Sequence, residues 1–254
     1  MINRYEAVLN GVPLSGISAD ILIVDIKYTP PAFQDEIYTV AGRRGGRIYR
    51  RNVDQLKVSI SFMIRAYDVM ERQQICNAVQ QWAGRGGVLQ INDRENQRLR
   101  CVCSELPVIS SALKWTGVLS VGFTAYSLPF WEELVPSVIS LSGTSGNGNL
   151  WVPGCIDGAM VEVDATANAS VTSLSMTVNG RTLTLSGLSV SAGQTIKIAY
   201  DDDMIQSIKV GNTSLLTKRT GVDDLEADCG QNNSFSFTSD GAVSVDFKVR
   251  GLWV

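Results

Sequence analysis

The sequence predicts a mostly β protein built from two domains. Apolar and polar residues alternate along much of the chain, which is the period of half-buried strands. Only residues 68–84 show the apolar period of a helix, and they lie in the first half. A junction flanked by prolines at 129 and 136 separates that half from one that contains strand patterns alone. We therefore expect an α+β first domain at residues 1–133, with one helix on a sheet, and a β-sandwich at residues 137–254.

The junction follows a well-defined strand pattern. Residues 118–126 alternate small with bulky side chains, as in a strand packed on at least one side. Pro129 stops this strand because proline donates no backbone hydrogen bond. Phe130 and Trp131 come directly after it, followed by two glutamates. This order predicts the closing strand of one domain and the hinge to the next, with the boundary between Phe130 and Ser142.

The first domain is expected to contain several strands and one long loop. The segment 55–65 gives the clearest strand, because five large apolar residues fall on one face and mostly polar residues on the other. Residues 41–51 (AGRRGGRIYRR) hold five arginines and are expected to form a loop. The expected strands cover residues 4–9, 21–28, 55–65, 88–93, 99–105 and 115–126.

Residues 68–84 carry the helix signals. Asp68 can cap the first turn, and Glu71 stands at capping-box spacing from it. One apolar stripe recurs at helical spacing, made of Ile75, Ala78, Val79 and Trp82. Gly84 is expected to end the helix in the left-handed conformation that glycine adopts at little cost. We expect Trp82 to anchor this helix to the sheet rather than to line a ligand site.

The second domain is expected to be a β-sandwich of short strands joined by turns. Asn179-Gly180 is the strongest hairpin signal, since both central positions of that turn need positive φ, and Asp240-Gly241 is a second. Residues 143–149 (GTSGNGN) are expected to form a flexible connector or a wide loop. The expected strands cover residues 159–164, 172–178, 181–186, 195–200, 205–210, 234–238 and 242–254.

The composition argues against several classes of function. The chain has no histidine, so it has no Ser-His-Asp triad, histidine base or histidine metal ligand. We expect no enzyme activity, no catalytic residue, no metal and no cofactor. The net charge is −3, far from the basic excess of a nucleic-acid-binding protein. No signal peptide or membrane-spanning apolar run is expected. The five cysteines are expected to be reduced, because Cys101 and Cys103 would share one face of a strand.

The arginine-rich segment admits three interpretations. Gly42–Gly46 could cradle a phosphate, but a strand pattern follows where a helix would be needed. The arginines could contact a nucleic-acid backbone, yet only Tyr49 could stack on bases. A solvated or intersubunit loop is therefore favoured. Arg43, Arg44 and Arg47 are the candidate residues of a subunit interface.

Two further patterns in the second half could bind a ligand. Asp201–Asp203 and the loop 223–228 could supply oxygen ligands to calcium, but neither has the spacing of a calcium loop, so solvated turns are favoured. As a glycosidase pair these carboxylates would need a cleft, and no pattern locates one. Trp151, Trp253 and Tyr200 could stack on sugars, although core packing is the commoner fate of such residues.

The order of these elements resembles the distal tail protein (Dit) family of long-tailed, non-contractile bacteriophages and prophages. The closing segment 247–253 (FKVRGLW) makes the second domain similar to the galectin-like β-sandwich of that family. The resemblance covers nearly the whole chain, and the order of the motifs gives it its specificity. The residues that carry it are Gly42-Arg43, Gly45-Gly46, Val58–Ile64, Glu71–Trp82, Trp115-Thr116-Gly117 and Phe123–Trp131.

The resemblance implies a structural role at the distal end of a phage tail. Members of the family form a hexameric ring through the first domain, around the channel through which DNA leaves. The implied partners are further copies of the chain, with stacked rings as an option, the tail tube protein, a tail-associated hub or lysin protein and a receptor-binding protein. No membrane and no specific nucleic acid is implied. The chain would be made in the bacterial cytoplasm and reside in the virion.

Within such a ring, Arg43 and Arg47 are expected to contact a neighbouring subunit, with a position on the ring lumen as the weaker option. The alternative function is a carbohydrate-binding β-sandwich module that mediates host or surface attachment. That alternative accounts for the second domain and leaves residues 1–133 unexplained.

Overall fold

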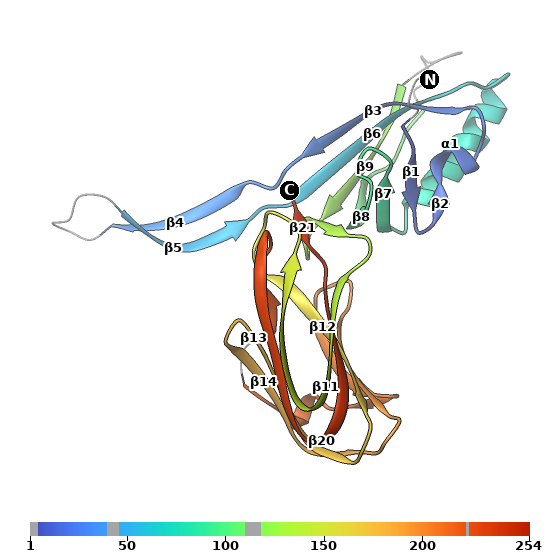
Figure 1. The fold of residues 1–254 in the computed structure, drawn as a ribbon. Helices are drawn as coiled ribbons and strands as arrows, with labels where there is room; N and C mark the ends of the chain where they lie inside the picture. Colours follow the sequence, from blue (N-terminus) through green and yellow to red (C-terminus); the bar gives the residue numbers. More distant parts are fainter. Residues whose placement is uncertain (1–4, 40–45, 110–117, 222–223) are drawn as a thin grey trace. The chain divides into compact units, whose positions relative to one another are not determined.

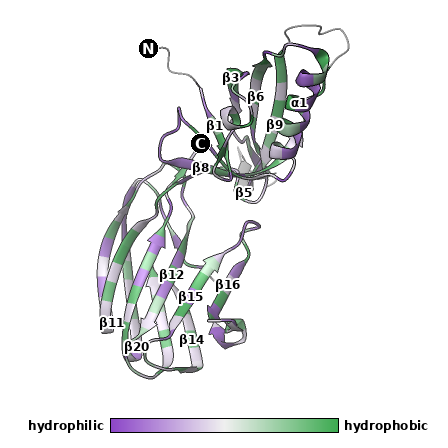
Figure 2. Ribbon diagram, turned by 90° about the vertical axis from the view of Figure 1, so that its right-hand side faces the viewer, coloured by the Kyte–Doolittle hydropathy of each residue, from purple (hydrophilic) through white to green (hydrophobic). Residues whose placement is uncertain are grey.

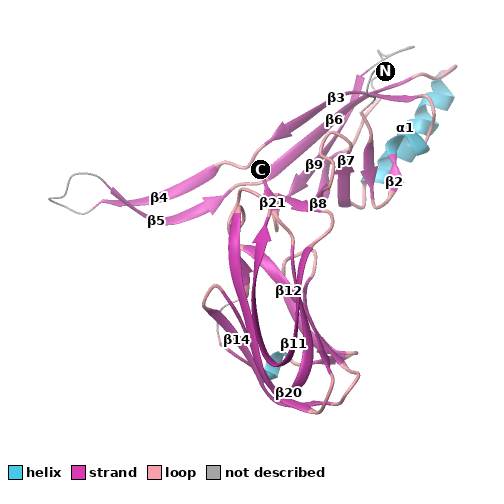
Figure 3. Cartoon of the chain, in the orientation of Figure 1, coloured by secondary structure: helices cyan, strands magenta, loops and turns pink. Residues whose placement is uncertain are grey.

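The chain folds into two compact units, Met1–Trp131 and Glu132–Val254. Strands make up most of both units (Figure 1), and the α-helix lies in the first (Figure 3), so the prediction of a mostly β protein is confirmed. The computed structural model describes residues 5–39, 46–109, 118–221 and 224–254.

The first unit is built on an antiparallel sheet in which the strands follow the order β2-β1-β7-β8-β9-β6-β3. β6 lies between β3 and β9. Its alternate residues, among them Ile60 and Phe62, are fully buried, as the sequence predicts. The strands are β1 (Ala7–Leu9), β2 (Val12–Pro13), β3 (Ile21–Thr29), β6 (Leu56–Ile64), β7 (Gly87–Ile91), β8 (Gln97–Glu105) and β9 (Val118–Ala125), with a short 3-10 helix, η1 (Leu14–Gly16), after β2.

The helix α1 (Val69–Ala83) begins as the sequence predicts, because the Asp68 carboxylate accepts a hydrogen bond from the Glu71 amide at 2.8 Å. Its buried stripe differs from the predicted one. The buried positions are Arg72, Cys76, Val79 and Ala83, while Ile75, Ala78 and Trp82 flank this stripe and are half-buried. The helix is therefore rotated by about one position from the predicted orientation.

The predicted helix end is also displaced. Gly84 remains in the right-handed helical conformation, with φ −62°. Gly86 adopts the left-handed conformation instead, with φ 62°. An added Cβ at Gly86 would lie 2.6 Å from the Cys101 carbonyl oxygen, so the chain leaves the helix by passing directly against β8.

The Trp82 side chain holds the helix against the sheet through its indole N–H group and its ring. Its indole Nε1 donates to the Val12 carbonyl at 2.9 Å. Its ring meets the buried Phe123 of β9 edge-on, with centroids 5.9 Å apart. These contacts give Trp82 the anchoring role that the sequence predicts.

β4 (Phe33–Thr39) and β5 (Gly46–Val53) form a separate two-stranded ribbon between β3 and β6. Figure 1 shows this ribbon leading away from the ends of β3 and β6. The loop expected at residues 41–51 is thus wrong for residues 46–51, which are strand. The six residues 46–51 (GRIYRR) contain the β-branched and aromatic pair Ile48 and Tyr49, which suits a strand despite the arginines.

The end of the first unit is fixed by Trp131, which is fully buried. The Tyr28 ring meets it edge-on at 5.9 Å between centroids. The Arg94 guanidinium lies over both rings, 4.8 Å from Tyr28 and 4.9 Å from Trp131. The Tyr28 hydroxyl donates to the Asp93 carboxylate at 2.6 Å. Trp131, the second residue of the aromatic pair at the predicted junction, therefore belongs to the core of the first unit.

The second unit contains strands only, apart from a short 3-10 helix, η2 (Leu216–Lys218). Its strands follow the order β17-β16-β15-β12-β20-β13-β14-β18, and β11 pairs with β20 as well. Along β12 and β15, hydrophobic residues alternate with hydrophilic ones (Figure 2). The strands are β10 (Trp131–Glu133), β11 (Ser137–Val152), β12 (Ala159–Ala167), β13 (Val171–Val178), β14 (Arg181–Val190), β15 (Thr195–Tyr200), β16 (Gln206–Val210), β17 (Thr213–Ser214), β18 (Arg219–Thr220), β19 (Glu226–Ala227), β20 (Gln231–Val249) and β21 (Leu252–Trp253).

The long strand β20 joins the two layers of this unit. Its first part, up to Ser239, pairs with β13, and its second part, from Val243 onward, pairs with β12. The rings of Phe235 and Phe247, twelve residues apart on β20, lie 5.3 Å apart in the core. The strand therefore doubles back on itself, and its two parts face each other across the core (Figure 1).

β11 follows β20 around the same bend, which overturns the loop expected at residues 143–149. Its register shifts between Gly143 and Ser145, where β20 changes its partner strand. An added Cβ at Gly148 would lie 2.7 Å from Ile139 Cδ1, and one at Gly146 would lie 3.2 Å from Leu141 Cβ, both in the first half of β11. These glycines therefore allow the two halves of β11 to face each other across the edge of the core.

The two predicted hairpins have different outcomes. Asn179 and Gly180 form the tight turn between β13 and β14, with φ 49° and 84°. Asp240 and Gly241 form no tight hairpin turn; they lie at the bend where β20 passes from β13 to β12 without a break in the strand.

Hydrogen bonds join the beginning and the end of the second unit. The Glu133 amide donates to the Gly251 carbonyl at 2.9 Å. The Arg250 side chain donates to the Glu133 carbonyl at 2.9 Å and also to that of Leu134. Over the residues that the structure describes, no helix is long and apolar enough to cross a bilayer.

Candidate assembly surfaces

The strand β4 of the ribbon presents its described side chains to solvent. Every described β4 side chain from Phe33 to Ile37 is exposed, with Phe33 at 49% and Ile37 at 63%. A two-stranded ribbon has no core of its own and is marginally stable in water. Exposed apolar side chains on such a ribbon are therefore well placed to gain stability from a second protein surface.

The register of the ribbon places acidic residues across from basic ones. Asp35 stands opposite Arg51, and Glu36 stands opposite Arg50. Opposite charges on facing strands stabilise a β pair by a few tenths of a kcal/mol to about 1 kcal/mol. Two of the five arginines in this segment thus have an acidic residue at the facing position.

One of the three predicted interface residues lies in this ribbon. Arg47 is in β5, where its Cα partner is Tyr38 rather than an acid. Arg43 and Arg44 lie outside the described residues. The glycine-arginine pattern drew attention to this segment of the sequence. The exposed Phe33 and Ile37 of the facing strand were not predicted, because two isolated apolar residues do not form the alternating pattern of a strand.

The acidic clusters of the second unit are occupied by local hydrogen bonds. In Asp201–Asp203, one carboxylate oxygen of Asp201 accepts from the amides of Asp203 and Ile205, at 3.0 and 2.8 Å. This is the geometry of a turn. No group of three or more acidic or cysteine side chains gathers for a metal in the part of the chain that the structure describes, and Asp223 lies outside it.

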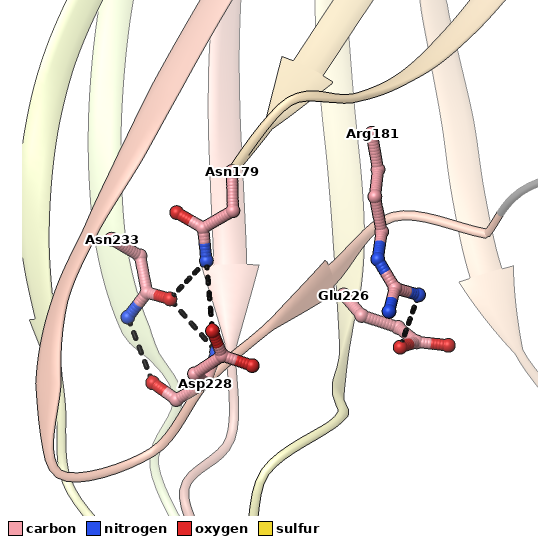
Figure 4. A network of polar contacts seen from close by, with 5 residues as sticks. All are labelled: Asn179, Arg181, Glu226, Asp228 and Asn233. Carbon is pink, nitrogen blue, oxygen red and sulfur yellow. Dashed lines mark hydrogen bonds and ion pairs between the residues drawn. The ribbon is translucent and has the colours of Figure 1, made fainter.

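Glu226 and Asp228 take part in polar contacts around the β13–β14 turn (Figure 4). Glu226 pairs with Arg181, and Asp224 pairs with Arg219 at 3.1 Å. The Asp228 carboxylate accepts from Gln231 Nε2 at 2.9 Å. These ion pairs are partly exposed, so each contributes about 0–1 kcal/mol.

Asn233 is the buried centre of this network. Its Oδ1 accepts from the Asp228 amide at 2.8 Å and from Asn179 Nδ2 at 2.7 Å. Its Nδ2 donates to the carbonyls of Asp228 and Gln231, at 2.8 and 3.1 Å. Because the amide of Asn233 is fully satisfied, it holds the turn in place and leaves no group directed at a ligand.

Four of the five cysteines lack the features of a catalytic thiol. All five are free, and Cys101 and Cys103 form no bridge, as their spacing predicts. Burial raises the pKa of the Cys101 thiol to about 12 and raises the pKa values of Cys76, Cys103 and Cys229 as well. A thiol with a raised pKa is a poor nucleophile at neutral pH, because the thiolate is the reactive form.

The three aromatic residues considered for sugar stacking differ in exposure. Tyr200 is buried, which raises its pKa to about 12, and its hydroxyl accepts from Gln206 at 2.9 Å. Trp253 is half-buried in β21. Trp151 is 55% exposed on β11, where Asn232 of β20 is its cross-strand partner. Only Trp151 presents a ring to solvent that a ligand could cover.

One feature of the second unit had no sequence signal. β11 carries 16 residues and pairs with β20 along its whole length. No other described residue pairs with its second edge. The glycines of residues 143–149 hid this strand, because glycine weakens every strand pattern based on side chains.

Comparison with solved structures finds this fold in a phage protein. The crystal structure of the SPP1 Dit (gp 19.1) protein, described as a paradigm of the hub adsorption apparatus in phages that infect Gram-positive hosts, matches with a TM-score of 0.68. The match covers 97% of this chain and 98% of that one at 11% sequence identity. A chain of the phage P2 baseplate, in its activated conformation with Ca, matches with a TM-score of 0.50 over 99% and 98% of the two chains at 10% identity.

A scan against protein-family models and a search of curated protein sequences find no match. The likeness to the SPP1 protein therefore concerns the fold, and for the fold it confirms the resemblance predicted from the sequence.

Proposed function

We propose that this chain is a structural component of a phage tail tip. In this role it forms a hexameric ring that links the tail tube to the host-adsorption apparatus. The observation that carries the proposal is the match to the SPP1 Dit protein over both units, since 97% of the chain takes part in it. Function resides in sites rather than in folds, so the proposal also needs a surface suited to assembly.

The ribbon of β4 and β5 supplies such a surface. A closed ring of identical subunits uses a heterologous contact, in which one surface of each copy meets a different surface of the next. The exposed Phe33 and Ile37 offer apolar area to a neighbour. Arginine complements it, because its planar fork pairs with carboxylates in two places at once. We infer that Arg43 and Arg47, with Arg44 between them in the segment, contact the neighbouring subunit.

The remaining partners follow from the same role. The ring would contact the tail tube protein on one side and a hub or lysin protein and a receptor-binding protein on the other. The second unit, which we propose to be a galectin-like β-sandwich domain, would carry contacts outside the ring-forming domain. The chain would be made in the host cytoplasm and reside in the virion, without enzymatic activity of its own.

The test is the mass of the full chain in solution, measured by native mass spectrometry and light scattering. We expect a mass of six copies or a multiple of six. The double substitution Arg43→Glu with Arg47→Glu should give folded monomers, because it replaces attraction to a neighbouring carboxylate by repulsion. Arg65→Glu with Arg85→Glu is the matched control, since both residues are exposed in the same unit and the charge change is equal.

A wild-type chain that remains monomeric would refute the ring. Rings that persist in the Arg43→Glu, Arg47→Glu variant would refute the role of these arginines while leaving the ring itself intact. Dissociation of both variants would show that the effect comes from net charge rather than from this segment.

A second candidate function, binding of a neutral carbohydrate by the second unit, is favoured by Trp151. Its exposed ring could stack on a sugar, and Asn149 and Asn232 beside it can both donate and accept hydrogen bonds. Retardation of the full chain in native gels that contain dextran or galactomannan would support it. Trp151→Ala should abolish that retardation, whereas Val138→Ala, at the other exposed apolar residue of β11, should leave it unchanged.

A further inference from the structure

β11 differs from the other edge strands of the protein in its length and its lack of charge. The far ends of the second unit's sheet are β17 and β18, with two residues each. In the first unit, the edge strand β2 contains Pro13, and the edge strand β3 carries Asp25 and Lys27. Short strands, prolines and charges are the means by which proteins prevent edge-to-edge association.

β11 has none of these three protections. Over its 16 residues, SVISLSGTSGNGNLWV, there is no charged residue and no proline. Only β20 pairs with it among the described strands, so the backbone groups of its outer edge have no strand partner there. An unpaired edge of this kind is a template for another strand, with the backbone supplying the hydrogen bonds.

The side chains of β11 suit pairing with an identical strand. When a strand pairs antiparallel with its own copy, residues near its middle face themselves, so any charge there would repel its counterpart. β11 has no charge to repel. Its solvent-facing residues are mainly serine, threonine and asparagine, and the second unit already joins neighbouring strands through such residues. These pairs are Thr166–Thr195, Ser175–Thr184 and Thr177–Thr182, at 2.9, 3.0 and 2.9 Å between hydroxyl oxygens.

The bend adds a second reason to expect a copy of the same chain. The first half of β11 extends the layer that contains β12, and the second half extends the layer that contains β13. A single short peptide strand could cover one half only. A second copy related by a two-fold axis brings both of its halves at once, and the two pairings then reinforce each other.

We propose that two copies of this chain associate through β11, which pairs antiparallel with β11 of the second copy in both layers of the second unit. This contact is isologous, with the same surface on both sides. It is separate from the proposed ring contact, which is heterologous and lies in the first unit. In a protein that forms rings, it would join two rings or two neighbouring assemblies.

The first test is the mass of the full chain by light scattering over a range of concentrations. We expect the mass of the wild type to double as the concentration rises, from one copy to two or from one ring to two. Ser140→Lys with Asn149→Lys places a lysine near the middle of each half of β11, opposite its own counterpart. We expect this variant to raise the dissociation constant of the pairing by about tenfold or more at low salt.

The matched control is Ser234→Lys with Ser244→Lys, because these residues lie one strand further in, on β20, and add the same charge. We expect this control to pair like the wild type. A control that weakens pairing equally would overturn strand pairing at the edge, as it would show contact through the sheet face or a general charge effect. A wild type whose mass never doubles up to millimolar concentration would overturn the proposal outright.

The second test follows the backbone by hydrogen exchange at concentrations above and below the doubling. Amides of β11 should exchange more slowly in the associated form, while amides of the charged edge strand β3 should not change. Unchanged exchange along β11 in a species of doubled mass would also overturn the proposal. If the chain forms no ring, the mass of six copies is never observed. If β11 does not pair, the mass never doubles with concentration. The two measurements therefore test the ring and the β11 pairing separately.

Discussion

Asn179-Gly180 and Asp240-Gly241 are the same kind of sequence signal, yet the first is a tight turn between two strands and the second lies at a bend within one continuous strand. Both pairs join a residue that tolerates positive φ to a glycine, so local conformational preference does not separate them. What separates them is the space around the glycine. An added Cβ at Gly180 would meet nothing within 4 Å, whereas one at Gly241 would lie 2.2 Å from the Ser170 carbonyl oxygen.

The second pair stands where β20 changes its partner strand. Asp240 accepts hydrogen bonds from the amides of Thr172 and Ser173, at 3.0 and 3.1 Å, and from the Thr172 hydroxyl. Gly241 then passes directly against the connection between β12 and β13. The aspartate caps the start of β13, and the glycine leaves room for the chain that crosses it. A residue pair typical of turns can therefore serve as a crossing point when another segment occupies the space of its side chain.

The largest effect is expected from Gly241→Ala. The added methyl group would collide with the Ser170 backbone, which cannot rotate away as a flexible side chain can. We expect a loss of about 3 kcal/mol in the free energy of unfolding, at the upper end of overpacking costs. Urea denaturation followed by circular dichroism measures it. A loss below that of Gly180→Ala would show that the connection at Ser170 yields readily.

Asn179→Ala should have the next largest effect. The side chain of Asn179 donates to Asn233 at 2.7 Å and accepts from the Ser234 amide at 3.0 Å. Its φ of 49° is also unfavourable for alanine. We expect a loss of about 2 kcal/mol from these two causes together. Asn179→Gly removes the hydrogen bonds without the strain, so it should cost less. Equal losses in the two variants would show that strain contributes nothing at this turn.

Gly180→Ala should cost about 1 kcal/mol, because the left-handed conformation is strained for alanine even where no atom collides. Its φ is 84° and its surroundings are open. Melting temperature and urea midpoint measure the change, with Gly193→Ala as the control at another open turn of the same unit, with φ 85°. A loss as large as that of Gly241→Ala would remove the distinction between the two glycine pairs.

These two sites show what the sequence can and cannot predict. Periodic side chains predicted the strands around Ile60 and the helix that Asp68 caps, because their signals are local. The sequence also suggested an overall order of elements that the match to the SPP1 Dit protein bears out for the fold. The strand β11 was not predicted because Gly146 and Gly148 are required by contacts with Phe237 of β20 and with the first half of β11 itself. No local sequence pattern contains such contacts.

The candidate assembly surface was predicted only in part, because it too depends on contacts between two segments of the chain. The arginines drew attention to residues 41–51, but the pairing of that segment with β4, and hence the exposed Phe33 and Ile37, depends on the register between two strands. The helix stripe was displaced by one position because the buried face of a helix is set by its packing on the sheet. Register and close approach are properties of pairs of segments, and a single segment does not encode them.

The smallest effect concerns the aspartate of the crossing point, and it should appear only in acid. Hydrogen bonds from Thr172 and Ser173 to the carboxylate lower the pKa of Asp240 to about 2, from an ordinary value of 3.8. A carboxyl group whose pKa is lower in the folded state stabilises the fold above its unfolded-state pKa, and this contribution disappears as the pH falls through the folded-state pKa. We therefore expect Asp240→Asn to be less stable than the wild type at pH 5, and the difference to shrink between about pH 4 and pH 2. Asp246→Asn, on the same strand, is the control for the general removal of a carboxylate. A difference between wild type and Asp240→Asn that stays constant over this range would show that the capping of β13 does not depend on the charge of Asp240.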